Sequence, residues 1–316
     1  MAGGPTTPAL VAAARSAGAL GFLAGGYKTP EQLAGELGEG SYGVNLFAPN
    51  PVPVDPAAYA SYAERLRPLA ERLGAPLPAT PSDDDDAWEE KVALLAASPP
   101  ALVSFTFGLP GPSADRLRRA GCLLAQTVTS ADEARLADEA GMDVLVVQAP
   151  AAGGHAGTFT PATPVVPRPL PDLVREIRAA VDLPVIAGGG VASAADVRDA
   201  LEAGAQLVAV GTLLLLADDA GTSPTYRSAL EGPDRGEPVL TRAYSGRPAR
   251  GLPTTFMATY DASAPLGYPA VHHLTSPLRR AAAAAGDADN VNLWAGTGYR
   301  AARRGGAAEI LRSLLP

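Results

Sequence analysis

Short apolar runs alternate with longer amphipathic stretches over the first two-thirds of this chain. Runs of four to six apolar residues between turn signals predict buried strands. We expect seven strands, at residues 19–24, 42–47, 101–105, 122–126, 144–147, 184–187 and 207–210. A segment with helical spacing of apolar residues follows each strand. This alternation predicts βα units that together build a parallel sheet.

Capping residues locate the helices between these strands. Thr7-Pro8 predicts a helix that stops at Gly18, and Ser130 with Glu133 predicts a capping box. Further helices are expected at residues 30–37, 56–73, 87–97, 113–120, 170–181 and 193–203, and a short one at 213–217. Seven units are close to the eight of a (β/α)8 barrel, and the chain opens on a helix without a strand. We therefore predict a TIM barrel whose first strand is missing from this chain, with a doubly wound sheet as the alternative.

From residue 218 onward the alternation stops. Helical spacing recurs at residues 226–230, 277–285 and 307–315, and Pro- and Gly-rich connections at 244–251 and 294–299 carry aromatic residues and arginines. We predict two domains, a barrel over residues 1–217 and a mainly helical cap over residues 218–316. Tyr260 and Tyr299 are the cap residues that we consider as candidates for the pocket wall.

Composition and charge narrow the class of protein. The 316 residues are 47% hydrophobic, which is enough for a large core. The net charge of -8, without basic clusters, argues against nucleic acid or a membrane as partner. The single cysteine, Cys122, cannot form an internal disulfide, and no apolar run approaches the roughly 20 residues that span a bilayer. No signal peptide is apparent. We expect a soluble, cytoplasmic protein.

One loop carries the strongest chemical signal. The strand at 144–147 ends at Gln148, and an open loop is expected to present His155 among Gly153, Gly154 and Gly157. The glycines allow the backbone to approach a ligand closely, and the histidine can move a proton near neutral pH. A general base is favoured over a histidine that binds a local carbonyl. No metal site and no serine-hydrolase motif is present.

Other titratable groups are given structural roles. The run Asp83 to Asp86 is predicted to be a solvated loop that also supplies negative charge to a helix amino terminus, rather than a metal site. His272 and His273 are predicted to be loop or packing residues.

Two glycine-rich loops follow the last two strands. Gly188-Gly189-Gly190 and Gly211-Thr212 each open a helical segment, and loops in this position of a barrel commonly bind phosphate. Neither is a dinucleotide fingerprint or a P-loop. Asn45 and Gln148 lie at the carboxyl ends of strands, where their amides either bind the edge of a heteroaromatic ring or tie loops together.

Taken together, these motifs resemble those of the nitronate monooxygenases, formerly called 2-nitropropane dioxygenases. The resemblance rests on Gln148 to Gly157, residues 184–191, Val210-Gly211-Thr212, residues 245–251 and Trp294-Ala295-Gly296. It implies an FMN-containing barrel that oxidises alkyl nitronates and nitroalkanes with O2. His155 would remove the α-proton of a neutral nitroalkane. The residues that would contact FMN are Gly188, Gly189, Gly211 and Thr212 at its phosphate, Asn45 and Gln148 at its ring, and Gly154, Met1, Ala2 and Gly3 close by.

The chain departs from the family pattern in two places. Ala151 and Ala156 replace a glutamate and an arginine, which puts the substrate preference in question. The strand that family members have before the first helix is absent, so we expect a start further upstream rather than an open barrel with two exposed edges. The alternative functions are an FMN-dependent NADH:quinone or enoyl reductase and a truncated flavin-binding paralogue without activity. The oligomeric state stays open.

Overall fold

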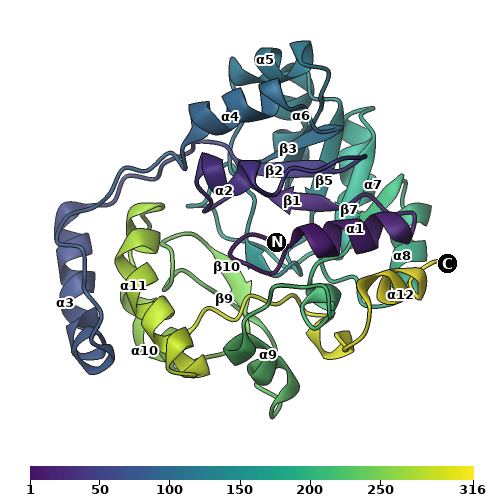
Figure 1. Cartoon of the computed structure of the whole chain (residues 1–316). Coiled ribbons are helices and arrows are strands. Elements are labelled where there is room, and N and C mark those ends of the chain that lie inside the picture. Colours follow the sequence, from purple (N-terminus) through teal and green to yellow (C-terminus); the bar gives the residue numbers. More distant parts are fainter.

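A curled parallel sheet forms the centre of the computed structural model, which describes residues 1–316 (Figure 1). Its strand order is β1-β2-β3-β4-β5-β7-β8, and every neighbouring pair is parallel. The strands are β1 (Phe22–Ala24), β2 (Gly43–Phe47), β3 (Leu102–Thr106), β4 (Leu123–Val128), β5 (Val144–Gln148), β7 (Val185–Gly188) and β8 (Leu207–Ala209). All seven predicted strands are confirmed. Because the order never reverses, the doubly wound alternative is wrong.

Seven helices connect these strands or precede them. They are α1 (Pro8–Ser16), α2 (Pro30–Ala34), α4 (Trp88–Ala97), α5 (Ser113–Arg119), α6 (Ala131–Glu139), α7 (Leu170–Ala180) and α8 (Ala194–Glu202). Thr7 caps α1 through the N–H of Leu10, as predicted. Ser130 caps α6, but the Glu133 carboxylate accepts from Thr129 rather than from Ser130. The predicted capping box is therefore wrong in its second half. The short helix expected at 213–217 is the 3-10 helix η1 (Thr212–Leu214).

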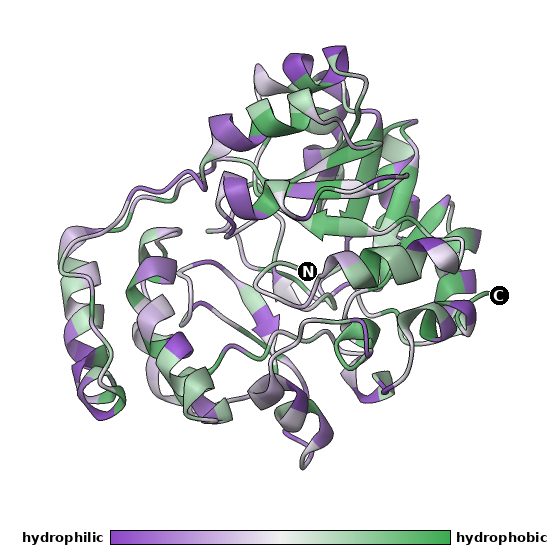
Figure 2. Ribbon diagram, in the orientation of Figure 1, coloured by the Kyte–Doolittle hydropathy of each residue, from purple (hydrophilic) through white to green (hydrophobic).

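The strands are apolar because their side chains are covered on both sides of the sheet. Val44, Val103, Leu124, Leu145 and Val185 have no exposed surface. Figure 2 shows the hydrophobic strands at the centre and hydrophilic residues on the surrounding helices. Burial of this kind is the main favourable term in folding, at about 25 cal/mol per Å² of apolar surface.

The sheet does not close on itself. β1 pairs only with β2, and β8 pairs only with β7, so each of these two strands has one edge without a strand partner. Leu207 on β8 is half-exposed as a result. None of the helices combines the length and the apolar character that crossing a membrane requires.

A second layer contains helices and a small antiparallel sheet. Its elements are α9 (Pro224–Glu231), α10 (Thr255–Tyr260), α11 (Ala270–Ala284) and the short 3-10 helices η2 (Asp261–Ser263), η3 (Ala288–Asn290) and η4 (Tyr299–Ala301). The sheet has the order β6-β10-β9, with β6 (Gly154–His155), β9 (Val239–Thr241) and β10 (Ala249–Gly251). This sheet was not predicted, because its strands lie in Pro- and Gly-rich connections without an apolar run of four or more residues. The helix α11 begins at Ala270, seven residues before the predicted start at residue 277.

Two helices cross between the layers. α3 (Pro56–Leu73) leaves the barrel strands and lies beside α11 (Figure 1), where Tyr59, Tyr62 and Leu66 join a hydrophobic cluster with Tyr244 and Leu274. At the other end of the chain, α12 (Ala307–Arg312) returns to pack against α1. The two layers are thus interlocked by helices from both ends of the sequence.

Candidate active site

A cavity of about 960 Å³ lies where the carboxyl ends of the strands face the second layer. Its wall contains every site residue expected from the sequence: Met1, Ala2, Gly3, Asn45, Gln148, Gly154, His155, Gly188, Gly189, Gly211 and Thr212. These residues come from the chain start, from strands β2, β5, β6 and β7, and from the loops after β7 and β8. The structure therefore brings them together, while their individual roles remain predictions.

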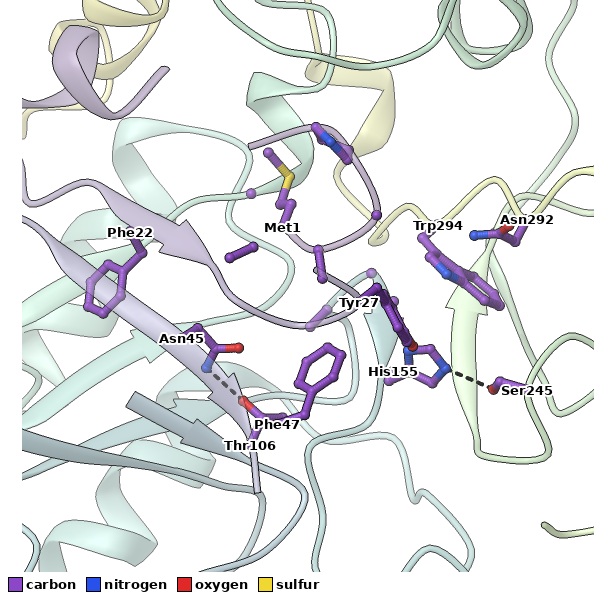
Figure 3. A pocket seen from close by; sticks show the side chains of 18 of the residues that line it. Met1, Phe22, Tyr27, Asn45, Phe47, Thr106, His155, Ser245, Asn292 and Trp294 are labelled. Atoms are coloured by element: carbon purple, nitrogen blue, oxygen red, sulfur yellow. Dashed lines mark hydrogen bonds between the residues drawn. The ribbon is translucent and has the colours of Figure 1, made fainter. Parts of the chain in front are cut away.

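His155 is held by backbone pairing rather than by an open loop, so that expectation was wrong. It belongs to β6 and pairs with Ala249 of β10. Its Nε2 lies 2.8 Å from Ser245 Oγ (Figure 3), and that hydroxyl lies 3.2 Å from the carbonyl oxygen of Arg247. When the hydroxyl donates to this carbonyl, its oxygen accepts the Nε2 proton. In that tautomer Nδ1, which has no protein partner, carries a free lone pair, and His155 lines the cavity.

The electrostatic setting of His155 differs from the expectation of a pKa near 7. The pKa of His155 is lowered to about 3, mainly by burial and in addition by the positive charges of Arg247 and Arg279. The imidazole is therefore neutral at physiological pH, which is the state that can accept a proton. Its protonated form is unfavourable unless a negative charge develops beside it.

The two amides predicted to contact a ligand are used differently. Gln148 donates from Nε2 to the carbonyl of His155 and accepts at Oε1 from the N–H of Gly157, so both ends of this amide hold the His155 loop. Asn45 donates from Nδ2 to Ser104 and Thr106. Its Oδ1 accepts nothing from the protein and lines the cavity. Asn45 is thus free to accept from a ligand, whereas Gln148 positions the loop.

The two glycine-rich loops leave backbone donors unpaired. The N–H groups of Gly189, Gly190 and Gly211 donate to no protein acceptor, and all three residues line the cavity. Gly189 has φ +114°, and a Cβ there would lie 2.8 Å from the carbonyl oxygen of Ala149. Unpaired N–H groups at the edge of a parallel sheet are typical of an anion site. Gly154, at φ +80°, has open space where a Cβ would stand.

Part of the cavity wall consists of aromatic rings that were not predicted from the sequence. Phe107 and Trp294 pack against His155 at ring-centroid distances of 5.8 and 5.5 Å, and Tyr27 stacks on His272 at 4.3 Å. Tyr27, Asp86, Ala87 and Phe107 are the non-glycine residues with positive φ, and all four line the cavity. Left-handed backbone is costly for such residues, and it concentrates at functional sites. No local pattern in the sequence marks these conformations.

The acidic loop and the two histidines of the second layer also lie at this wall. Asp86 Oδ2 lies 2.8 Å from Nζ of the buried Lys91, and Asp84 Oδ2 lies 2.8 Å from His273 Nε2. Asp83, Asp84 and Asp85 are exposed directly before α4, as the prediction of a solvated loop at a helix amino terminus requires, whereas Asp86 is half-buried. His272 and His273 belong to α11 and line the cavity, so they are not loop residues.

Neither cap tyrosine suggested by the sequence lines the cavity. Tyr299 donates its hydroxyl to Asp234, and Tyr260 packs on Phe256. The second layer contributes His272, Arg279, Asn292 and Trp294 to the wall instead.

Comparison with known proteins extends over the whole chain. The sequence profile of the family "Nitronate monooxygenase" matches residues 1–316. The chain is 37% identical to the nitronate monooxygenase of Pseudomonas aeruginosa, over 99% of this chain and 93% of that protein. It is 32% identical to a probable nitronate monooxygenase of Staphylococcus aureus, over 99% of this chain and 91% of that protein.

Solved structures agree with this assignment. A nitroalkane oxidase from Streptomyces ansochromogenes superposes with a TM-score of 0.91 at 40% identity, covering 99% of this chain and 92% of that one. FabK from Thermotoga maritima, at 22% identity and a TM-score of 0.76, covers all of this chain and 89% of that one, and shares the fold. Over its full length, this chain belongs to the nitronate monooxygenase family of flavin-dependent oxidoreductases.

Proposed function

We propose that this protein is an FMN-dependent nitronate monooxygenase that oxidises alkyl nitronates, and less efficiently nitroalkanes, with O2. The observation that carries the proposal is the shared cavity, in which the unpartnered Nδ1 of His155 and the unpaired N–H groups of two glycine loops face the same space. An anion site and a proton acceptor in one cavity suit a phosphate-anchored cofactor and a substrate that loses an α-proton.

The residues at the strand ends fit FMN. Gly189, Gly190 and Gly211 would hold its phosphate through their free N–H groups, and a Cβ at Gly189 would displace this loop by clashing with Ala149. The free Oδ1 of Asn45 would accept from the ring, and Gly154 leaves room for a close approach. Bound FMN would supply the electron transfer and O2 chemistry, which no side chain can provide.

His155 would take the α-proton of a neutral nitroalkane at Nδ1 while Ser245 fixes the ring through Nε2. Because burial and two arginines disfavour the imidazolium, this proton transfer requires the negative charge that develops on the nitro group beside it. A preformed nitronate already carries that charge and needs no base. We therefore expect nitronates to be much better substrates than the corresponding nitroalkanes.

We also propose the finer architecture. The sheet would be an eight-stranded barrel that lacks one strand between β1 and β8, since those two edges are unpaired. Residues 1–217 would form the FMN-binding barrel and residues 218–316 the cap. α3 would extend the barrel segment into the cap, and α12 would extend the cap segment back to the barrel.

The experiment measures O2 uptake with propyl-2-nitronate and, separately, NADH oxidation with a quinone, using the purified flavin-loaded protein. We expect nitronate-dependent O2 uptake and negligible NADH oxidation. NADH turnover without nitronate oxidation would instead favour the reductase alternative. A protein that cannot be loaded with flavin would favour the inactive paralogue.

His155→Asn separates the base from the rest of the site. General base catalysis contributes about 10²–10⁴ in rate, so turnover of 2-nitropropane should fall by about this factor. Oxidation of the preformed nitronate should fall less than about tenfold, because that reaction needs no proton acceptor. An equal loss on both substrates would refute the base role.

A further inference from the structure

The charge of the cavity wall is opposite to that of the whole chain. The chain carries a net charge of -8. Among the charged side chains of the wall, Lys28 pairs with Glu36 and Asp86 with Lys91. Arg279 and Arg280 have no carboxylate partner, and Asp84 has no arginine or lysine partner. Two unpaired arginines against one such aspartate leave the wall positive.

Arg279 is held firmly, but only by neutral acceptors. Its Nε donates to Thr275 Oγ1 at 3.2 Å, and Nη1 donates to Asn292 Oδ1 at 3.1 Å. Nη2 lies 3.2 Å from Nδ1 of His272, whose pKa is lowered well below its usual value by burial and by the charge of Arg279. One of the two Nη1 hydrogens has no protein acceptor. The guanidinium is thus oriented and retains an uncompensated charge.

Two series of neighbouring residues lie between Arg279 and His155. Asn292, which accepts from Arg279, lies two residues before Trp294, and the Trp294 ring packs 5.5 Å from His155 (Figure 3). On the other side, the ring of Tyr268 lies 6.2 Å from His272 and 5.9 Å from His155. The positive charge of Arg279 lowers the pKa of His155, which agrees with this proximity.

We propose that Arg279 is the anion receptor of the cavity and binds the planar oxyanion of the substrate, the nitronate group itself. This inference rests on the proposed function. Arg279 is half-buried, and partial removal of an unpaired charge from water is costly, so a bound anion offsets that cost. The two oxygens of a nitronate are arranged like those of a carboxylate, the group that guanidinium donors match best. Arg279 would thereby select the anionic nitronate over the neutral nitroalkane.

Calorimetric binding of unreactive probes to the flavin-loaded protein tests the receptor directly. Butyrate is a planar oxyanion that resembles a small nitronate, and butyramide is its neutral counterpart. We expect wild-type protein to bind butyrate at least tenfold more tightly than butyramide. Equal affinity for the two probes would overturn the proposal without any variant.

Three variants refine the assignment. Arg279→Gln retains hydrogen-bonding capacity without the charge, and it should remove the preference for butyrate. Arg279→Lys retains the charge and should keep part of the preference. Arg280→Gln is the matched control: this neighbouring arginine also lines the wall, but it is exposed and its charge is screened by solvent, so the preference should change less than threefold. Equal losses in the two Gln variants would mean that general positive potential, rather than Arg279, attracts the anion, and would overturn the proposal.

A failure of this proposal can be distinguished from a failure of the proposed function. Wild-type protein that oxidises nitronates but binds butyrate independently of Arg279 would refute the receptor alone. Arg279-dependent butyrate binding without nitronate oxidation would support the receptor and refute the nitronate activity. In kinetics, the receptor predicts that Arg279→Gln raises KM for the nitronate more than it lowers kcat.

Discussion

At the scale of single residues, the surroundings of His155 set its charge state, which differs from that of a histidine with the usual pKa. A histidine with an unperturbed pKa would be partly protonated near pH 6.5. Here burial and the charges of Arg247 and Arg279 keep it neutral, and Ser245 holds one of its nitrogens. The same arginines that disfavour an imidazolium favour an anion nearby. A proton on His155 and an anion bound beside it would therefore stabilise each other.

This environment predicts a pH dependence of stability. Between pH 6.5 and 3 the unfolded chain binds a proton at His155 and the folded protein does not, so stability is lost as the pH falls below 6.5. When the pH falls from 7.5 to 5.5, proton binding at His155 in the unfolded chain should lower the free energy of unfolding of the wild-type protein by about 1 kcal/mol. His155→Asn should lack this part of the loss. Urea denaturation at both pH values measures the difference, and identical losses in the two proteins would contradict the lowered pKa.

At the scale of elements, the glycine loops after β7 and β8 combine strained backbone with unpaired donors. Gly189→Ala would force an alanine to φ +114° and place its Cβ 2.8 Å from Ala149 O. We expect FMN affinity to fall at least tenfold, as measured by fluorescence titration of the flavin-free protein.

Gly121→Ala is the matched control for that substitution. Gly121 has φ +94°, but a Cβ there meets nothing within 4 Å, and the residue lies outside the cavity wall. It should cost about 1 kcal/mol of stability and leave FMN affinity unchanged. Similar affinities for both variants would show that the Gly189 loop does not hold the phosphate.

Elements marked by an apolar run or by capping residues were predictable, and strands without an apolar run were not. The seven strands and the helix Pro56–Leu73 follow from apolar spacing and capping residues that lie within each segment. β6, β9 and β10 contain two or three residues each, and they exist because residues far apart in the chain pair. The sequence analysis accordingly described His155 as a loop residue.

At the scale of the whole molecule, α3 joins the hydrophobic cluster of the second layer. Leu66 has no exposed surface there, so Leu66→Ala should cost about 2–5 kcal/mol of unfolding free energy. FMN affinity should be retained, because the glycine loops lie in the other layer. Leu136→Ala, at an exposed leucine of α6, should change stability by less than about 0.5 kcal/mol. Guanidinium denaturation compares the two, and equal stability would contradict the packing role of α3.

The sequence by itself determined the parallel βα order, the two glycine loops and the membership of His155 in the site. These features are local, since periodicity, caps and glycines act within a few residues. Only the tertiary structure decided which groups surround His155. Ser245 is 90 residues away in the chain, and Arg279 reaches the cavity from a helix of the second layer. The charge state of His155 and the positive wall of the cavity arise from these distant contacts, because electrostatic interactions depend on distance and burial rather than on position in the chain.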